Sequence, residues 1–229
     1  MVTGATKGIG RAVVEIFAKN GHNLAICSRN NQELQELANR LKLAYGVNVY
    51  YEQCDVADKS DVEMFAENAL AEFGHFDVLI NNAGVFMPGA ILAEEHETFE
   101  TMLNTNLVSA YTLTKLIVPY MVIKKSGHVF NICSTASIKA YPNGGSYCIS
   151  KFALYGMTKV LREELMETGV KVTAILPGPT YSASWHSANI PKERFMMAEE
   201  VAQAVYAAFA MPGNAVFEDI VMRPQLGDI

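Results

Sequence analysis

Two side chains that lie four residues apart carry the first sign of chemistry. Tyr147 and Lys151 fall near the start of a helical pattern, so both lie on one face of the expected helix. A phenol has a reference pKa near 10, and an ammonium about 4 Å away contributes roughly 4 kcal/mol at an effective dielectric constant of 20. That energy lowers the pKa of a phenol by up to about 3 units. If the pair faces a site, Lys151 lowers the pKa of Tyr147 enough for proton transfer at neutral pH. The alternative is a surface or packing pair, because this spacing is common by chance.

Further polar residues fall at expected strand ends and at a helix interruption. Ser134 closes a strand candidate thirteen residues before Tyr147, and a hydroxyl there either holds a carbonyl oxygen or forms a turn. The run Asn81-Asn82-Ala83-Gly84 follows another strand, where ligands of open α/β sheets bind. Asn106 interrupts a helical stretch in which Asn is a poor helix former. These positions are candidates for one shared site.

A glycine-rich turn lies near the N-terminus, between a short strand and an amphipathic helix. Glycines let a pyrophosphate approach the backbone, and a helix N-terminus offers free N–H groups and the positive end of a dipole. The spacing departs from G-x-G-x-x-G, and tight packing is the alternative explanation. We expect a dinucleotide to contact Gly4, Thr6, Lys7, Gly8, Ile9 and Gly10.

Two cations bear on which dinucleotide this is. Lys7 lies inside the turn, and Arg29 directly follows the strand candidate Leu24–Ser28. A carboxylate at the end of that strand usually holds a ribose 2′-hydroxyl, whereas a 2′-phosphate is held by Arg or Lys. No carboxylate occurs from residue 24 to residue 32. The sequence therefore favours NADP(H) over NAD(H).

The elements that must position these residues alternate between short apolar runs and longer helical patterns. This alternation predicts βαβ units and a parallel sheet covered on both faces. Strands are expected at Met1–Thr3, Leu24–Ser28, Val47–Cys54, Val78–Asn81, His128–Ser134, Val170–Leu176 and Ala215–Met222. Helices are expected at 10–20, 31–45, 60–73, 97–124, 147–168 and 198–210, the third of them capped by Asp58.

Composition narrows the class of protein. The length of 229 residues fits one domain over residues 1–229. The long unpatterned segment at about 177–197 is the expected substrate loop. The net charge of −6 argues against a nucleic-acid binder. Lysine and glycines within the first ten residues argue against a signal peptide, and polar residues break every long apolar stretch. The four cysteines show no metal-ligand spacing. We expect a cytoplasmic protein with no metal and no membrane partner.

The joint pattern resembles the single-domain branch of the short-chain dehydrogenase/reductase family. It consists of the glycine turn, Asn-Asn-Ala-Gly, a serine ahead of Tyr-x-x-x-Lys, and Pro177-Gly178 after the sixth strand. The resemblance implies a Rossmann-type doubly wound parallel sheet, seven strands in order 3-2-1-4-5-6-7, with helices on both faces. It also implies a homodimer or homotetramer that associates through the helices at 97–124 and 147–168.

The resemblance further implies roles for single residues. Tyr147 is the acid or base, Ser134 polarises a carbonyl, and Asn106 positions a water molecule. Lys151 holds the nicotinamide ribose and lowers the pKa of Tyr147. The cofactor-binding residues that it adds to the glycine turn and Arg29 are Asp55, Val56, Asn82, Ala83, Gly84, Tyr147, Lys151, Pro177, Gly178 and Thr180.

Aromatic residues mark the expected substrate side. Phe86, Tyr141, Tyr181 and Trp185 suit a small-molecule carbonyl substrate that is flat or apolar, although packing explains such residues equally well. Residues 181–185 and 218–229 are similar to a bacterial sepiapterin-reductase-like branch, which implies a dicarbonyl or a pterin side-chain ketone. A 3-oxoacyl-thioester reductase and a noncatalytic NADP-binding, redox-responsive protein stay open as alternatives.

Overall fold

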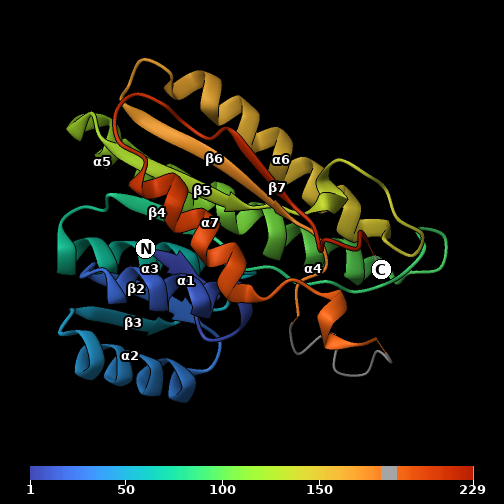
Figure 1. Ribbon diagram of the computed structural model, residues 1–229, viewed down its shortest axis with the longest axis horizontal. Coiled ribbons are helices and arrows are strands. Elements are labelled where there is room, and N and C mark those ends of the chain that lie inside the picture. The colour runs from blue at the N-terminus through green and yellow to red at the C-terminus, as the bar shows by residue number, and fades with distance from the viewer. Residues whose placement is uncertain (182–189, 229) are drawn as a thin grey trace.

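The computed structural model describes residues 1–181 and 190–228, which form a seven-stranded sheet in the order β3-β2-β1-β4-β5-β6-β7 (Figure 1). Every pair of neighbouring strands is parallel. This confirms the expected fold class and strand order. The strands are β1 (Val2–Thr3), β2 (Leu24–Ser28), β3 (Val49–Gln53), β4 (Val78–Asn81), β5 (Gly127–Ile132), β6 (Val170–Pro177) and β7 (Asp219–Met222).

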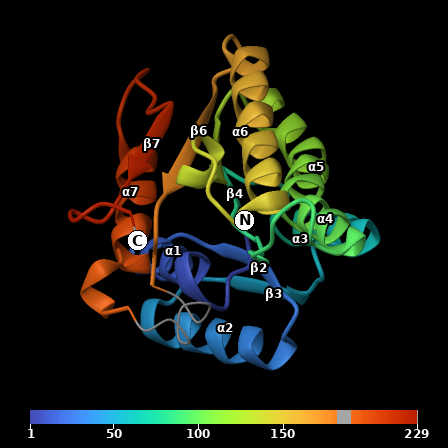
Figure 2. The ribbon, with the colours of Figure 1, turned by 90° about the vertical axis from the view of Figure 1, so that its right-hand side faces the viewer.

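Helices cover both faces of this sheet, as Figure 2 shows. They are α1 (Gly8–Lys19), α2 (Asn31–Tyr45), α3 (Lys59–Phe73), α4 (His96–Leu103), α5 (Ser109–Lys124), α6 (Gly145–Leu165) and α7 (Ala198–Ala210). One core cluster packs α1, α2 and α7 around residues such as Phe17 and Leu34. The cluster on the opposite face packs α3, α5 and α6 around Phe65 and Ile117. The caps follow the sequence: the predicted cap Asp58 accepts a hydrogen bond from the Ser60 N–H at 2.8 Å.

One continuous helix was expected over 97–124, and this is wrong because the structure divides the segment into two helices. A π-helical turn over Asn104–Val108 separates α4 from α5. Such a turn inserts one extra residue into a helix, and π-turns are frequent at functional sites. Asn106 lies within it. By length and composition the whole segment His96–Lys124 could cross a membrane, but half of its most apolar window is buried inside this fold.

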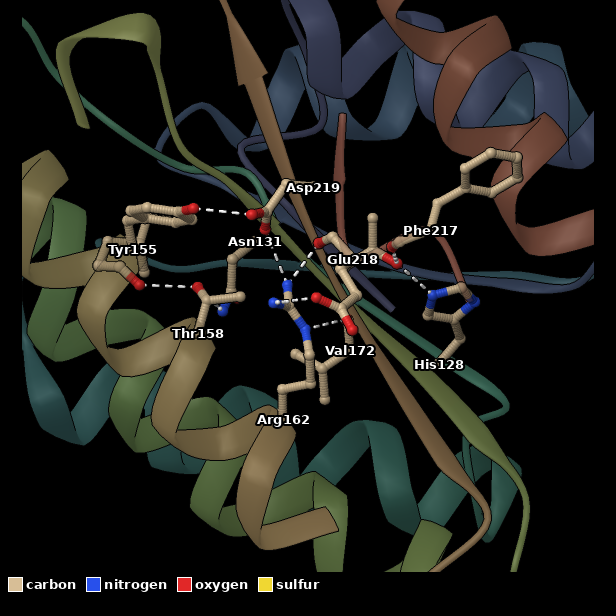
Figure 3. A network of polar contacts seen from close by, with 11 residues as sticks. His128, Asn131, Tyr155, Thr158, Arg162, Val172, Phe217, Glu218 and Asp219 are labelled. Atoms are coloured by element: carbon tan, nitrogen blue, oxygen red, sulfur yellow. Dashed lines mark hydrogen bonds and ion pairs between the residues drawn. The ribbon is translucent and has the colours of Figure 1, made fainter. Parts of the chain in front are cut away.

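Strand β7 is shorter than expected, because only Asp219–Met222 pairs with β6. Figure 3 shows how polar contacts fasten its start. The Arg162 guanidinium of α6 donates to the Val172 carbonyl at 3.1 Å and to the Asp219 carboxylate at 2.9 Å. The Tyr155 hydroxyl donates to the same carboxylate at 2.7 Å. These contacts fix the strand that carries the C-terminal residues to the carboxyl ends of the sheet.

Candidate active site

A cavity of about 1010 Å³ opens at the carboxyl ends of the strands, where the strand order reverses between β1 and β4. Ligands of open α/β sheets bind in this position. The volume is at the upper end of the usual range for small-molecule sites. The predicted residues that line it are Gly4, Thr6, Lys7, Gly8, Ile9, Arg29, Asp55, Val56, Asn82, Ala83, Gly84, Phe86, Ser134, Tyr141, Tyr147, Lys151, Pro177, Gly178, Thr180 and Tyr181.

Three predicted residues are not among these lining residues. Gly10 packs α1 against the turn, because a Cβ at this position would lie 2.2 Å from the Gly4 carbonyl oxygen. Asn106 is buried behind the cavity wall. Trp185 lies outside the described residues. Glycine at position 10 therefore supports the turn from behind, while Gly4 and Gly8 form its cavity side with positive φ angles of 64° and 52°.

Tyr147 lies in the first turn of α6, next to Ser134, which begins a 3₁₀ turn after β5. Loss of solvent around the phenol raises the pKa of Tyr147 above 10.0, and the hydrogen bond with the Ser134 hydroxyl lowers it by a smaller amount. The expected net lowering of this pKa by Lys151 is therefore wrong for the protein alone, where the pKa is raised. The Lys151 ammonium lies 5.9 Å from the ring centroid and donates to a backbone carbonyl, so burial dominates.

Lys151 is buried, with 4% of its surface exposed. Its ammonium donates to the Ile132 carbonyl at the end of β5, at 2.9 Å. Burial lowers the pKa of Lys151. An ammonium carries three donors, and among the described residues it bonds only Ile132, so two can reach a ligand in the cavity that the residue lines. A Cβ at Gly84 would lie 3.4 Å from this nitrogen, so Gly84 is a close neighbour of the ammonium.

The Asn106 side chain joins the loop after β4 to α6. Its Nδ2 donates to the Val85 carbonyl at 3.0 Å and to the Ser150 hydroxyl at 2.9 Å, and its Oδ1 accepts from the Val85 N–H at 2.8 Å. The π-helical turn directs this side chain into the interior, where the residue is 1% exposed. Both amide donors are used within the protein. The role of Asn106 in holding a water molecule stays a prediction.

Asn82 holds the glycine-rich turn in shape. Its side-chain amide donates to the Thr3 carbonyl at 2.8 Å and to the Gly4 carbonyl at 3.2 Å. In return, the Thr3 hydroxyl accepts from the backbone N–H groups of Asn82 and Ala83 at 3.1 and 3.0 Å. The two predicted motifs are thus parts of one cradle. The free N–H groups at the start of α1 lie beside this cradle, where a pyrophosphate would bind.

The far end of the cavity fits a phosphorylated ribose. The Ser28 hydroxyl at the end of β2 is buried and has no hydrogen-bond partner among the described residues, which a ribose or phosphate oxygen would supply. Arg29 is exposed beside it. Lys7, however, pairs with the Glu33 carboxylate at 2.9 Å. Sequence reasoning missed Glu33 because this carboxylate lies one residue beyond the stretch 24–32, which contains none.

The part of the cavity lined by Phe86 and Tyr141 contains a carboxylate that sequence reasoning also missed. The Phe86 and Tyr147 rings pack in a T-shaped arrangement, with the centroids 4.9 Å apart. The Tyr141 hydroxyl donates to Asp228 Oδ2 at 3.0 Å, and Asp228 lines the cavity. Its Oδ1 is buried and accepts no hydrogen bond from the described residues, although the Arg223 guanidinium lies 3.6 Å away. No local pattern marks Asp228, because only the path of the chain after β7 brings it here.

Comparisons with known proteins agree with this geometry. The family model of the short chain dehydrogenases matches residues 1–193. The sepiapterin reductase of Chlorobaculum tepidum is 33% identical over 237 residues, covering 100% of this chain and 97% of that protein. The alcohol dehydrogenase of the archaeon Thermococcus sibiricus, solved with 5-hydroxy-NADP, is 27% identical with a TM-score of 0.90, covering 98% of this chain and 95% of that one. The L-sorbose reductase of Gluconobacter frateurii, solved with NADPH and L-sorbose, is 25% identical with a TM-score of 0.88, covering 97% and 94%.

The position of Arg29 predicts which dinucleotide binds more tightly. Arg29→Ala should weaken NADP⁺ binding by about 10- to 100-fold, because a charge-assisted hydrogen bond contributes roughly 1.5–3 kcal/mol. NAD⁺ binding should change little. Isothermal titration calorimetry gives both dissociation constants, and Arg40→Ala is the control because Arg40 is an arginine of α2 that does not line the cavity. A wild-type protein that binds NAD⁺ as tightly as NADP⁺ would contradict this assignment.

Proposed function

Because the chain belongs to the short-chain dehydrogenase family and is an oxidoreductase of that family, we propose that it reduces a ketone or aldehyde of a small molecule to an alcohol with NADPH. The observation that carries the proposal is the convergence of Ser134, Tyr147 and Lys151 on one cavity with the glycine-rich turn. Proton-transfer groups and a dinucleotide cradle in a single cavity suit hydride transfer to a carbonyl better than simple nucleotide binding.

The cofactor would be held by the glycine-rich turn, Arg29 and Lys151. The chemistry that NADPH supplies when bound is a hydride for the carbonyl carbon. The N–H groups at the start of α1 face the pyrophosphate region, and Arg29 supplies a charge for a 2′-phosphate. The two donors of Lys151 that bond no described residue suit ribose hydroxyls.

Ser134 and Tyr147 act on the carbonyl oxygen. Both hydroxyls lie in the cavity and interact with each other, so one oxygen placed between them would accept two hydrogen bonds. When the carbonyl carbon gains a hydride, its oxygen takes the phenolic proton and becomes a hydroxyl. The phenolate that remains is stabilised by the Ser134 hydroxyl and by the positive charge of Lys151. Burial keeps the proton on Tyr147 until this step.

A dicarbonyl or the side-chain ketone of a pterin is the substrate that we propose within this class. The similar protein from Chlorobaculum tepidum is a sepiapterin reductase. Asp228 supports the proposal, because its Oδ1 pairs with Arg223 at 3.6 Å but accepts no hydrogen bond from the described residues, so it suits the N–H donors of a heterocycle. The Phe86 ring, which packs on Tyr147, offers an apolar wall for a flat molecule.

The setting of the enzyme is also a proposal. We assign the cytoplasm, which the four free and buried cysteines support. We also propose that residues 1–229 act as one domain and assemble into a homodimer or homotetramer. Exposed apolar residues on α5 and α6, among them Tyr111, Ile123 and Val160, support association through these helices.

The proposed chemistry predicts the effect of removing one hydroxyl. Wild-type protein should oxidise NADPH in the presence of some members of a panel of diketones, aldehydes and sepiapterin, measured as loss of absorbance. Tyr147→Phe should lower kcat by several orders of magnitude, because the proton donor is lost, and should leave NADPH binding nearly intact. The matched control is Tyr155→Phe on the same helix, whose hydroxyl bonds Asp219 and does not line the cavity. Turnover retained by Tyr147→Phe, or a wild type that binds NADPH without turnover, would refute the proposal.

The carboxylate on the substrate side predicts selectivity among carbonyl compounds. Asp228→Asn keeps the shape of the side chain but removes its charge. We expect KM for sepiapterin to rise by about 10- to 100-fold, in line with roughly 1.5–3 kcal/mol for a hydrogen bond to a charged group, while KM for a simple diketone changes little. Steady-state kinetics with the two substrates measures this difference. Equal changes for both substrates would show that Asp228 does not recognise N–H donors.

A further inference from the structure

The loop over 85–95, between β4 and α4, folds over the first turn of α6. In Figure 2 the segment before α4 lies against the end of α6 where the helix begins. The Gly89 N–H donates to the Asn143 carbonyl at 2.9 Å, and Gly89 forms a parallel bridge with Gly144. The Phe86 ring of the same loop packs on Tyr147. The loop therefore contacts both the start of the helix and the proton donor that the helix carries.

Glu94, near the end of this loop, accepts hydrogen bonds from the N-terminus of α6. The helix has no side-chain cap of its own, because Gly144 stands at the capping position. Glu94 Oε1 instead accepts hydrogen bonds from the Ser146 N–H, at 3.2 Å, and from the Ser146 hydroxyl. Its Oε2 lies 3.4 Å from the same N–H. A carboxylate here meets free N–H groups and the positive end of the helix dipole.

The glycines beside Glu94 leave room for its carboxylate. A Cβ at Gly145 would lie 2.7 Å from the Gly89 carbonyl oxygen and 2.8 Å from Glu94 Oε2. Ser146, which receives the carboxylate, is fully buried at 0% exposure. Any side chain at position 145 would thus separate the loop from the helix. The contact between Glu94 and Ser146 therefore requires glycine at position 145, unlike an ordinary polar contact at the surface.

We infer that Glu94 is a positioning residue for Tyr147, acting through Ser146. Ser146 directly precedes Tyr147, so the bonds to Glu94 fix the rotation of the helical turn from which the phenol projects. Gly84, the residue before this loop, lines the cavity, and a Cβ there would lie 3.4 Å from the Lys151 nitrogen. Glu94 thereby holds the Tyr147 hydroxyl at a fixed position relative to Lys151 and the cofactor side of the cavity. This inference rests on the proposed function, since it assigns the residue to the proton-transfer step.

The contact predicts a loss of kcat with little change in cofactor binding. Glu94→Ala should lower kcat by about 10- to 100-fold, because small misplacements of a catalytic group are that costly, while KM for NADPH stays within about twofold. Glu94→Gln keeps one acceptor oxygen and should recover most of the lost kcat. The first turn of α6 should also exchange its amide hydrogens faster in Glu94→Ala, as measured by hydrogen–deuterium exchange over residues 145–151.

Asp58→Ala is a matched control elsewhere in the fold. Asp58 caps α3 with the same pair of bonds, to the N–H and hydroxyl of Ser60 at 2.8 and 2.6 Å, and it does not line the cavity. This variant should lose a similar amount of thermal stability and keep its kcat. If Glu94→Ala keeps kcat as well, or if Glu94→Gln recovers none of the loss, Glu94 does not position Tyr147.

The two proposals fail in distinguishable ways. A wild type without carbonyl turnover overturns the proposed function and, with it, the assignment of Glu94 to proton transfer. Unchanged exchange over residues 145–151 in Glu94→Ala overturns the positioning of this turn by Glu94, even when the wild type is active. Normal wild-type turnover with faster exchange and a selective loss of kcat in Glu94→Ala supports both.

Discussion

The site depends on burying the ammonium of Lys151 against the carbonyl of Ile132. A buried charge is tolerated only with close polar partners, so this bond fixes where α6 crosses the end of β5. Ile132 pairs with Ile175 of β6, and the parallel register therefore determines where the lysine is held. Tyr147 then lies one turn earlier on the same helix, and Ser134 lies two residues beyond the strand. The sheet and one side-chain bond together bring three polar groups into one cavity.

Burial has opposite consequences for the two ionisable groups. It raises the pKa of Tyr147 and lowers the pKa of Lys151, since it disfavours the charged form of each. The hydrogen bond with the Ser134 hydroxyl lowers the pKa of Tyr147 and offsets part of the effect of burial. The protein alone thus keeps Tyr147 as a neutral donor, which suits the reduction of a carbonyl. Stabilisation of the phenolate matters after the proton has left.

Much of this arrangement could be predicted from sequence, because local patterns carry it. Alternation of strands and helices, the glycine turn and the spacing of Tyr147 and Lys151 are short-range signals, and the strand order followed from the resemblance to a family. The remaining features are long-range. The π-helical turn that holds Asn106, the return of Asp228 to the cavity and the contact of Glu94 with Ser146 depend on packing between distant segments. The pKa of Tyr147 was predicted in the wrong direction because spacing gives proximity to a charge but not the loss of solvent.

The most direct test of the account is the titration of the Tyr147 phenol in the protein alone. Protein labelled with ¹³C at the tyrosine ζ carbon gives one resonance for each phenol, and comparison with Tyr147→Phe assigns the relevant one. The account predicts a pKa above 10.0 for Tyr147, rising further in Ser134→Ala because that variant loses a hydrogen bond which stabilises the phenolate. A pKa near 7 in the wild type, or no change in Ser134→Ala, would contradict it.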